Sequence, residues 1–154
     1  MSQTRVLGLD YGTRRIGAAI SDPRRKIASP LEVYERRDSV QDLRHYRALV
    51  EEHDVELIVV GLPVHTSGRE SPISKQVRAW GKNLGEALGV AVTYFDERNT
   101  SLEADEILIG VGFKIKDRKA RRDMLAAQIL LRNFLEAGCP IETTPPEPIE
   151  DENP

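Results

Sequence analysis

The sequence predicts an α/β domain built on a mixed five-stranded sheet with helices on both faces. Three segments with strand character come first, and strand-like and helical segments then alternate along the chain. The first three strands would pair as an antiparallel meander, and the alternating units would add parallel strands through helical crossovers. The length of 154 residues suits a single domain of this kind.

The five strands are predicted from apolar runs that lie between turn residues. Pro30 lacks a backbone donor, so the strand that contains it is expected at an edge of the sheet. The continuously apolar run LIVVGL indicates a central strand that is covered on both faces. The first two strands would form a hairpin around residues 11–13. The expected strands cover residues 6–10, 16–21, 27–34, 57–62 and 90–95.

Four helices are predicted from capping residues and apolar periodicity. Asp38, with Gln41 three residues later, can cap the first helix, and Thr100 with Glu103 forms the capping box of the third. The apolar side of the first helix is expected to hold Val40, Leu43, Leu49 and Val50. The other helices are expected over residues 72–88, 100–109 and 121–137, with a cationic loop before the last one.

Composition excludes several classes of protein. Hydrophobic residues make up 40% of the chain and charged residues 31%, which is typical of a soluble globular protein. No apolar run has the length of a membrane span, and the N-terminus has no secretory pattern. Cys139 is the single cysteine, which excludes an internal disulfide and a cysteine-rich zinc site. We therefore expect a protein of the reducing cytoplasm with no membrane partner.

The charge is unevenly distributed, although the formal net charge is only −3. Residues 139–154 carry five acids and no base and are rich in proline, so we expect this acidic tail to be disordered. The remaining domain, residues 1–138, carries 22 bases against 20 acids. Within it, residues 113–122 (FKIKDRKARR) hold six bases and one acid. Such a segment suits an anionic partner, although most charge runs are simply solvated.

Acidic residues follow two of the predicted strands at their carboxyl ends, where the sites of parallel sheets form. Asp10 ends the first strand, and Asp96 and Glu97 end the last. A third acid, Asp123, begins the apolar part of the last helix. Gly8 lies on the same strand face as Asp10, which leaves room for that helix to come close to the sheet.

Small residues and charge repulsion together suggest what these acids do. Ala126 and Ala127 would let the last helix sit close to the strand ends. Three carboxylates that converge with no basic residue between them repel one another, and divalent metal ions remove that repulsion. Oxygen ligands favour Mg²⁺ or Mn²⁺ over zinc, and two such ions can hold the attacking and leaving oxygens of a phosphodiester.

Each acid also has a simpler explanation. Asp10 can simply be a turn residue, because aspartate is common in turns. Asp96 and Glu97 can form a surface ion pair with Arg98. Asp123 can lie favourably near a helix N-terminus. Taken singly, the simpler explanation is favoured for each acid, and only their grouping at strand ends points to chemistry.

Five short motifs occur in the order 8–17 (GLDYGTRRIG), 21–23 (SDP), 59–63 (VVGLP), 96–98 (DER) with Thr100, and 123–127 (DMLAA). Together they resemble the YqgF/RuvX family of pre-16S rRNA nucleases, also described as Holliday-junction-resolvase-like, over residues 5–136. The resemblance implies a ribonuclease H-like fold, and it implies that Asp10, Glu97 and Asp123 are the active-site acids and metal ligands. Strand alternation agrees with this choice, because it places Asp96 on the opposite face.

Two positions depart from the family's pattern. The loop after residue 63 has His65 and Ser67 where the family has an asparagine and an aspartate, and Asn99 replaces an apolar or aromatic residue. Neither departure touches the three acids. Substrate contacts around this loop therefore stay open.

The resemblance implies an RNA nuclease of ribosomal RNA maturation that acts at the 5′ end of the 16S precursor. Three alternatives compete with this function, and the sequence argues against the last two. A junction-resolving DNA endonuclease should be a symmetric dimer, but the sequence does not distinguish a monomer from a homodimer. A non-catalytic nucleic-acid-binding module would have lost its acids, which are present here. A kinase-like ATPase shares the pattern of residues 10–13 but needs two lobes, for which the chain is too short.

Basic residues near the acids are expected to contact the phosphate backbone of a nucleic acid. Two of them follow the first strand, and six belong to the cationic segment that runs into Asp123. The expected contacts are Arg14, Arg15, Lys114, Lys116, Arg118, Lys119, Arg121 and Arg122.

Overall fold

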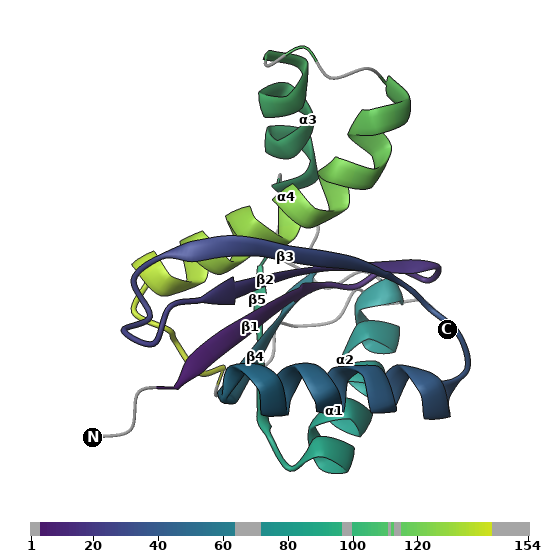
Figure 1. Cartoon of the computed structure of the whole chain (residues 1–154), viewed down its shortest axis with the longest axis vertical. Coiled ribbons are helices and arrows are strands. Elements are labelled where there is room, and N and C mark those ends of the chain that lie inside the picture. Colours follow the sequence, from purple (N-terminus) through teal and green to yellow (C-terminus); the bar gives the residue numbers. More distant parts are fainter. Residues whose placement is uncertain (1–3, 64–71, 97–99, 111, 113–114, 143–154) are drawn as a thin grey trace, which may run out of the picture.

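The computed structural model describes residues 4–63, 72–96, 100–110, 112 and 115–142 (Figure 1). In these residues the chain forms five strands and four helices, in the predicted order. No helix within these ranges is both long enough and apolar enough to cross a bilayer. The elements are β1 (Arg5–Asp10), β2 (Arg15–Ser21), β3 (Ala28–Glu35), α1 (Ser39–His53), β4 (Val55–Leu62), α2 (Pro72–Leu88), β5 (Ala91–Asp96), α3 (Thr100–Gly110) and α4 (Ile115–Glu136).

The strands form one mixed sheet in the order β3-β2-β1-β4-β5. β1, β2 and β3 are antiparallel neighbours, whereas β4 runs parallel to β1 and to β5, so the predicted mixed sheet is confirmed. β3 lies at an edge, as Pro30 predicts, and the β2–β3 register shifts beside that residue. In this topology β1, β3, β4 and β5 end, and β2 begins, at the same edge, which we call the strand-end edge.

Helices cover the two faces of the sheet, as expected. α1 and α2 pack on one face, onto residues such as Leu7, Leu9 and Ile58, and α4 packs on the other, onto Val6 and Val59 (Figure 1). α3 packs on α4 rather than on the sheet. The strand face that receives α4 is therefore the one on which Val6, Gly8 and Asp10 alternate.

Two glycines allow α4 to lie against the sheet. A Cβ on Gly17 of β2 would come within 2.1 Å of the Asp123 carbonyl oxygen, and a Cβ on Gly8 would come within 3.0 Å of Leu131 Cβ. The role predicted for Gly8 is therefore confirmed, but the tighter contact lies at Gly17. Ala127 faces the sheet, as expected from its size.

Two expectations about α4 are wrong. Ala126 packs against Ala104 of α3, so its small side chain serves the contact between the two helices rather than the approach to the sheet. α4 also begins at Ile115, so the part of the cationic segment from residue 115 onward is helical and not a loop. Lysine, arginine and alanine are good helix formers, so the helix begins soon after the glycines that end α3.

The caps of α1 and α2 agree with the sequence, whereas the apolar side of α1 does not. The Gln41 N–H donates to Asp38 Oδ1 at 2.8 Å, and Gly89 follows α2 with a φ of 67°. Val40, however, is 62% exposed. The buried side of α1 consists of Asp42, Tyr46 and Leu49, and its polar first member hid the pattern.

Gly17→Ala tests the contact between α4 and β2. The added methyl group must push the backbone of α4 away, so we expect the free energy of unfolding to fall by about 1–3 kcal/mol. Urea denaturation would measure the change. Gly110→Ala is the matched control, because a Cβ there meets nothing within 4 Å and should cost no stability. Equal stability of the Gly17 variant and the wild type would contradict the packing.

Candidate functional site

β1 brings Asp10 to the strand-end edge on the sheet face that α4 covers. Asp10 pairs with Gly17 across the antiparallel β1–β2 ladder, and it is half-buried. Directly opposite residues in an antiparallel pair share one face of the sheet. The absent side chain at Gly17 therefore leaves open space beside the Asp10 carboxylate, which α4 enters.

α4 supplies the second acid at this place. The carbonyl oxygen of Asp123 lies over Gly17, so the helix fixes Asp123 beside the strand pair that ends in Asp10. The Asp123 side chain is 19% exposed to solvent. Two of the three predicted acids thus share one face and one edge of the sheet, with access to solvent.

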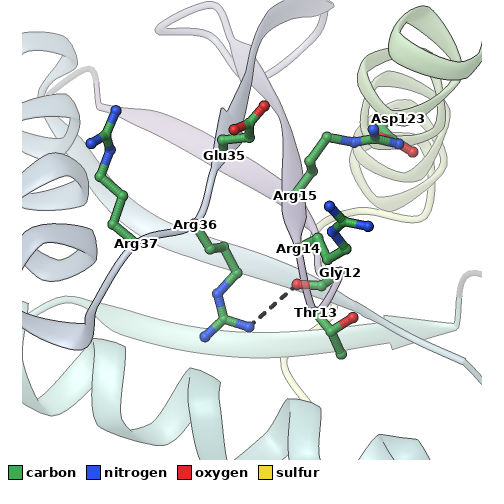
Figure 2. A pocket seen from close by; sticks show the side chains of 8 residues that line it. All are labelled: Gly12, Thr13, Arg14, Arg15, Glu35, Arg36, Arg37 and Asp123. Carbon is green, nitrogen blue, oxygen red and sulfur yellow. Dashed lines mark hydrogen bonds and ion pairs between the residues drawn. The ribbon is translucent and has the colours of Figure 1, made fainter.

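Arg15 is the direct partner of Asp123. Its Nε donates to Asp123 Oδ2 at 2.9 Å, and the two side chains point toward each other in Figure 2. Arg15 opens β2 and alternates with Gly17, so it projects to the same face as α4. In the structure this guanidinium offsets the negative charge of Asp123.

A basic cavity of about 750 Å³ opens beside this pair. Of the described residues, four arginines and two acids line it, and Figure 2 shows that they come from the β1–β2 loop, the start of β2, the end of β3 with the two residues after it, and α4. Arginine clusters of this kind suit phosphate groups, which accept several hydrogen bonds from a guanidinium. We call this space the arginine cavity; it is lined by Gly12, Thr13, Arg14, Arg15, Glu35, Arg36, Arg37 and Asp123.

Arg36 holds the loop that follows Asp10. Its Nη1 donates to Tyr11 Oη at 2.9 Å and to the Gly12 carbonyl oxygen at 3.3 Å, the second of which is drawn in Figure 2. Its guanidinium carbon lies 5.0 Å from the centre of the Tyr11 ring, within cation–π range. Its backbone N–H donates to the Arg14 carbonyl oxygen at 2.9 Å. Arg36, the first residue after β3, thus fixes the conformation of the loop next to Asp10.

A buried carboxylate, Asp42, supports Arg36 from α1. Arg36 Nε lies 3.6 Å from Asp42 Oδ2, and the Asp42 side chain is only 6% exposed. Asp42 Oδ1 also accepts from the Tyr34 hydroxyl at 2.7 Å and from the Arg37 N–H at 2.8 Å. Burial, and next the hydrogen bond to Asp42, raise the pKa of Tyr34 to about 12, so its hydroxyl stays a donor at neutral pH.

The predicted third acid, Glu97, lies outside the described residues. Its neighbours still bear on the choice between Asp96 and Glu97. Phe95 contacts Phe134 of α4, whereas Tyr94 contacts Arg78 of α2, so these two side chains point to opposite faces. Asp96 has the parity of Tyr94 and thus belongs to the face away from α4. Among the described residues no three His, Cys, Asp or Glu side chains gather, so a three-acid site depends on Glu97.

The basic residues predicted to contact phosphate lie in different places. Arg14 and Arg15 line the arginine cavity, whereas Arg122 lies 3.5 Å from Asp105 and is engaged with α3. Arg121 is exposed on α4. Lys114 and the side chains of Lys116, Arg118 and Lys119 lie outside what the structure describes.

Arg36 and Arg37 are cavity residues that the sequence analysis missed. The signal was present, because the pair directly follows β3, and a β2–β3 hairpin returns the end of β3 to the start of β2. The observed register pairs Arg15 with Glu35, next to both arginines. The hairpin register, taken together with the positive charges that follow β3, predicts that both arginines lie at the site.

A family model described as "RuvX: Holliday junction resolvase" matches residues 4–137. A protein of Caldanaerobacter subterraneus subsp. tengcongensis, named "Putative pre-16S rRNA nuclease", is 40% identical over 134 residues, which cover 86% of this chain and 96% of the relative. A protein of the same name from Lactococcus lactis subsp. cremoris is 38% identical over 135 residues, with 86% and 94% covered. These matches confirm the resemblance that the sequence motifs indicate.

Solved structures share the fold at low sequence identity. The Fowlpox virus resolvase in complex with Holliday junction DNA superposes with a TM-score of 0.55 at 12% identity, covering 87% of this chain and 98% of the resolvase. The T. thermophilus RuvC in complex with a Holliday junction gives a TM-score of 0.50 at 17% identity, with 88% and 96% covered. The ribonuclease H-like fold that the resemblance implies is thereby confirmed.

Arg36→Ala tests how much the loop after Asp10 depends on this guanidinium. The substitution leaves Asp42 buried without its cation, so we expect a loss of about 1–3 kcal/mol in the free energy of unfolding. Chemical denaturation would measure the loss. Arg132→Ala is the control, because it removes an exposed pair with Glu103 and should cost less than about 1 kcal/mol. Equal losses in the two variants would refute the anchoring role of Arg36.

Proposed function

This chain belongs to the RuvX family, and we propose that it is a divalent-metal-dependent nuclease that hydrolyses phosphodiester bonds in RNA and processes the 5′ end of pre-16S rRNA. The observation that carries the proposal is that Asp10 and Asp123 lie on the same sheet face and at the same edge, with the arginine cavity beside Asp123. The relatives' names support the choice of RNA.

The donor atoms at this place fit Mg²⁺ or Mn²⁺. Asp10, Asp123 and, in our proposal, Glu97 offer carboxylate oxygens, which are the ligands these ions prefer. Two ions bound there would activate a water molecule and stabilise the charge that develops on the cleaved phosphate. Arg15 Nε donates to Asp123, and it would be able to donate to a phosphate oxygen instead if Asp123 held a metal ion.

The chain's own residues orient the substrate. Arg14 and Arg37 line the arginine cavity and would hold phosphates next to the cleaved bond. Arg36 keeps the loop after Asp10 in place, and so limits the positions that the Asp10 carboxylate can take. The bases on α4 and just before it would extend the phosphate contacts along the nucleic acid; these are Lys114, Lys116, Arg118, Lys119, Arg121 and Arg122.

A junction-resolving DNA endonuclease is the second candidate function. The description of the family model and the junction complexes of the two structural relatives favour it. Such an enzyme must cut two strands in matched positions, so it should act as a symmetric dimer. A non-catalytic nucleic-acid-binding module is a weaker candidate, because the acids that catalysis needs are retained.

Asp10→Asn should abolish Mg²⁺- or Mn²⁺-dependent cleavage and leave the protein folded, because the amide keeps the shape of the side chain but loses its charge. The assay offers single-stranded RNA, a ribosomal precursor fragment and a four-way DNA junction, each with and without metal. Asp54→Asn is the matched control. Asp54 caps α1 in the left-handed region at φ 53°, which asparagine tolerates, and it lies where β4 begins, at the opposite edge.

Four outcomes of this assay would each contradict part of the proposal. Cleavage without metal, or full activity of the Asp10 variant, would rule out the mechanism. Cleavage of the four-way junction in preference to both RNAs would replace RNA by branched DNA as the substrate. Loss of activity in both variants would remove the special role of Asp10.

Arg15→Gln separates metal binding from substrate binding. The variant loses a positive charge next to Asp123, so we expect it to bind Mn²⁺ roughly threefold to tenfold more tightly, from about 1 kcal/mol of removed repulsion. We also expect weaker RNA binding. Calorimetric titration with Mn²⁺ alone measures the first effect, with Arg14→Gln as control. Unchanged Mn²⁺ affinity would show that Arg15 does not compete for Asp123.

A further inference from the structure

A second cavity, of about 510 Å³, lies between α1 and α2 on the sheet face opposite α4. Arg36 lines it and also lines the arginine cavity, so the two spaces adjoin at this side chain. Figure 2 shows Arg36 extending to Gly12, away from Glu35 and Arg37. We call the second space the helix cavity.

An aromatic wall gives the helix cavity the character of a ring-binding site. Trp80 of α2 is half-buried, and its ring centre lies 5.0 Å from that of Tyr11 and 6.1 Å from that of Tyr46. Both neighbouring rings are tilted or edge-on to Trp80, which holds the indole in a fixed orientation. Since Tyr11 directly follows Asp10, the wall is in contact with the loop of the candidate site.

Two buried polar atoms in the walls lack hydrogen-bond partners within the described part of the chain. They are the Tyr46 hydroxyl oxygen and Arg36 Nε, whose distance to Asp42 Oδ2 is that of an ion pair rather than a hydrogen bond. Burial raises the pKa of Tyr46, so its hydroxyl stays protonated. Unpartnered buried polar atoms are costly, and here both belong to side chains that line the helix cavity.

The two cavities differ in charge, so they suit chemically different parts of one ligand. Among the described residues that line the helix cavity, the acids Asp42 and Glu86 outnumber the one cation, Arg36, which disfavours a phosphate there. The arginine cavity next to it has the opposite balance. A neutral heteroaromatic ring with both acceptors and donors suits the helix cavity, and a phosphate attached to it suits the arginine cavity.

We infer that the helix cavity binds one unpaired nucleobase of the substrate, while the phosphate of the same nucleotide lies in the arginine cavity. The inference rests on the proposed function and names its substrate class, namely nucleic acid with an unpaired nucleotide beside the cleaved bond. A base in a duplex would have to leave its stack to enter, so paired substrate binds more weakly. A free nucleoside offers the same ring chemistry and is the other source to test.

Trp80 is the single tryptophan of the chain, so its fluorescence reports directly on this cavity. The full-length Asp10→Asn protein is titrated with a single-stranded oligoribonucleotide, with the same strand carrying abasic positions, with the duplex, and with adenosine and uridine. We expect saturable quenching by the intact single strand. We expect little quenching by the abasic strand or the duplex.

Ala87→Phe fills the helix cavity from an exposed wall position, and Ala79→Phe on the same helix is the matched control outside it. Loss of one stacked base should weaken binding of the single strand about tenfold in the Ala87 variant and leave the control unchanged. Trp80→Leu should weaken binding similarly, and Trp80→Phe should restore most of it. Circular dichroism verifies that each variant is folded.

Unchanged Trp80 emission with intact RNA, or equal affinity for intact and abasic strands, would overturn the inference. Quenching by a free nucleoside but not by RNA would overturn the assignment to the substrate. These binding measurements need no cleavage, so they are independent of the test of the proposed function. Metal-dependent cleavage without quenching refutes the base pocket alone, and base-dependent quenching without cleavage refutes the nuclease alone.

Discussion

The contact between α4 and the β1–β2 pair is the constraint on which the site depends. An acid at the end of a strand and an acid on a helix more than one hundred residues later can meet only if the helix backbone reaches the sheet. Gly17 makes this possible, because the Asp123 carbonyl oxygen occupies the space where any other residue would place its Cβ. Gly8 and Ala127 continue the same close approach along the helix. Packing thus sets the relative position of the two carboxylates before any ligand binds.

The Arg36 side chain connects this packing to the α1–α2 side of the sheet. Arg36 leaves the end of β3, fixes the loop after Asp10 through Tyr11 and Gly12, and is supported by Asp42 from α1. The α4 face therefore carries the acids, and the opposite face carries the aromatic wall around Trp80. Arg36 lines the cavities on both sides, and the Tyr11 ring also contacts Trp80, so the Asp10 loop is packed directly against the α1–α2 side.

Local patterns predicted the elements well, and the site in part. The apolar run of β4 and the Asp38 cap each act over a few residues, so the sequence reveals them directly. Asp42 shows the opposite case, since a buried carboxylate in the core stripe of α1 is explained only by its distant partners Tyr34 and Arg36. The roles of Arg36 and Gly17 depend likewise on strand register, which decides whether residues far apart in the chain meet. Glu97 stays a prediction from the family motif.

The positions of the charged residues matter more here than the net charge of the chain. A formal net charge of −3 argues against an anionic partner, yet four arginines gather at the strand-end edge beside Asp123. Surface charges separated by more than about 10 Å are largely screened at physiological salt, so a phosphate at this edge experiences mainly the charges close to it, which include these arginines. The strand topology concentrates these cations, because the end of β3 and the start of β2 must lie together. The same topology that places the acids therefore also places the charges that draw a polyanion to them.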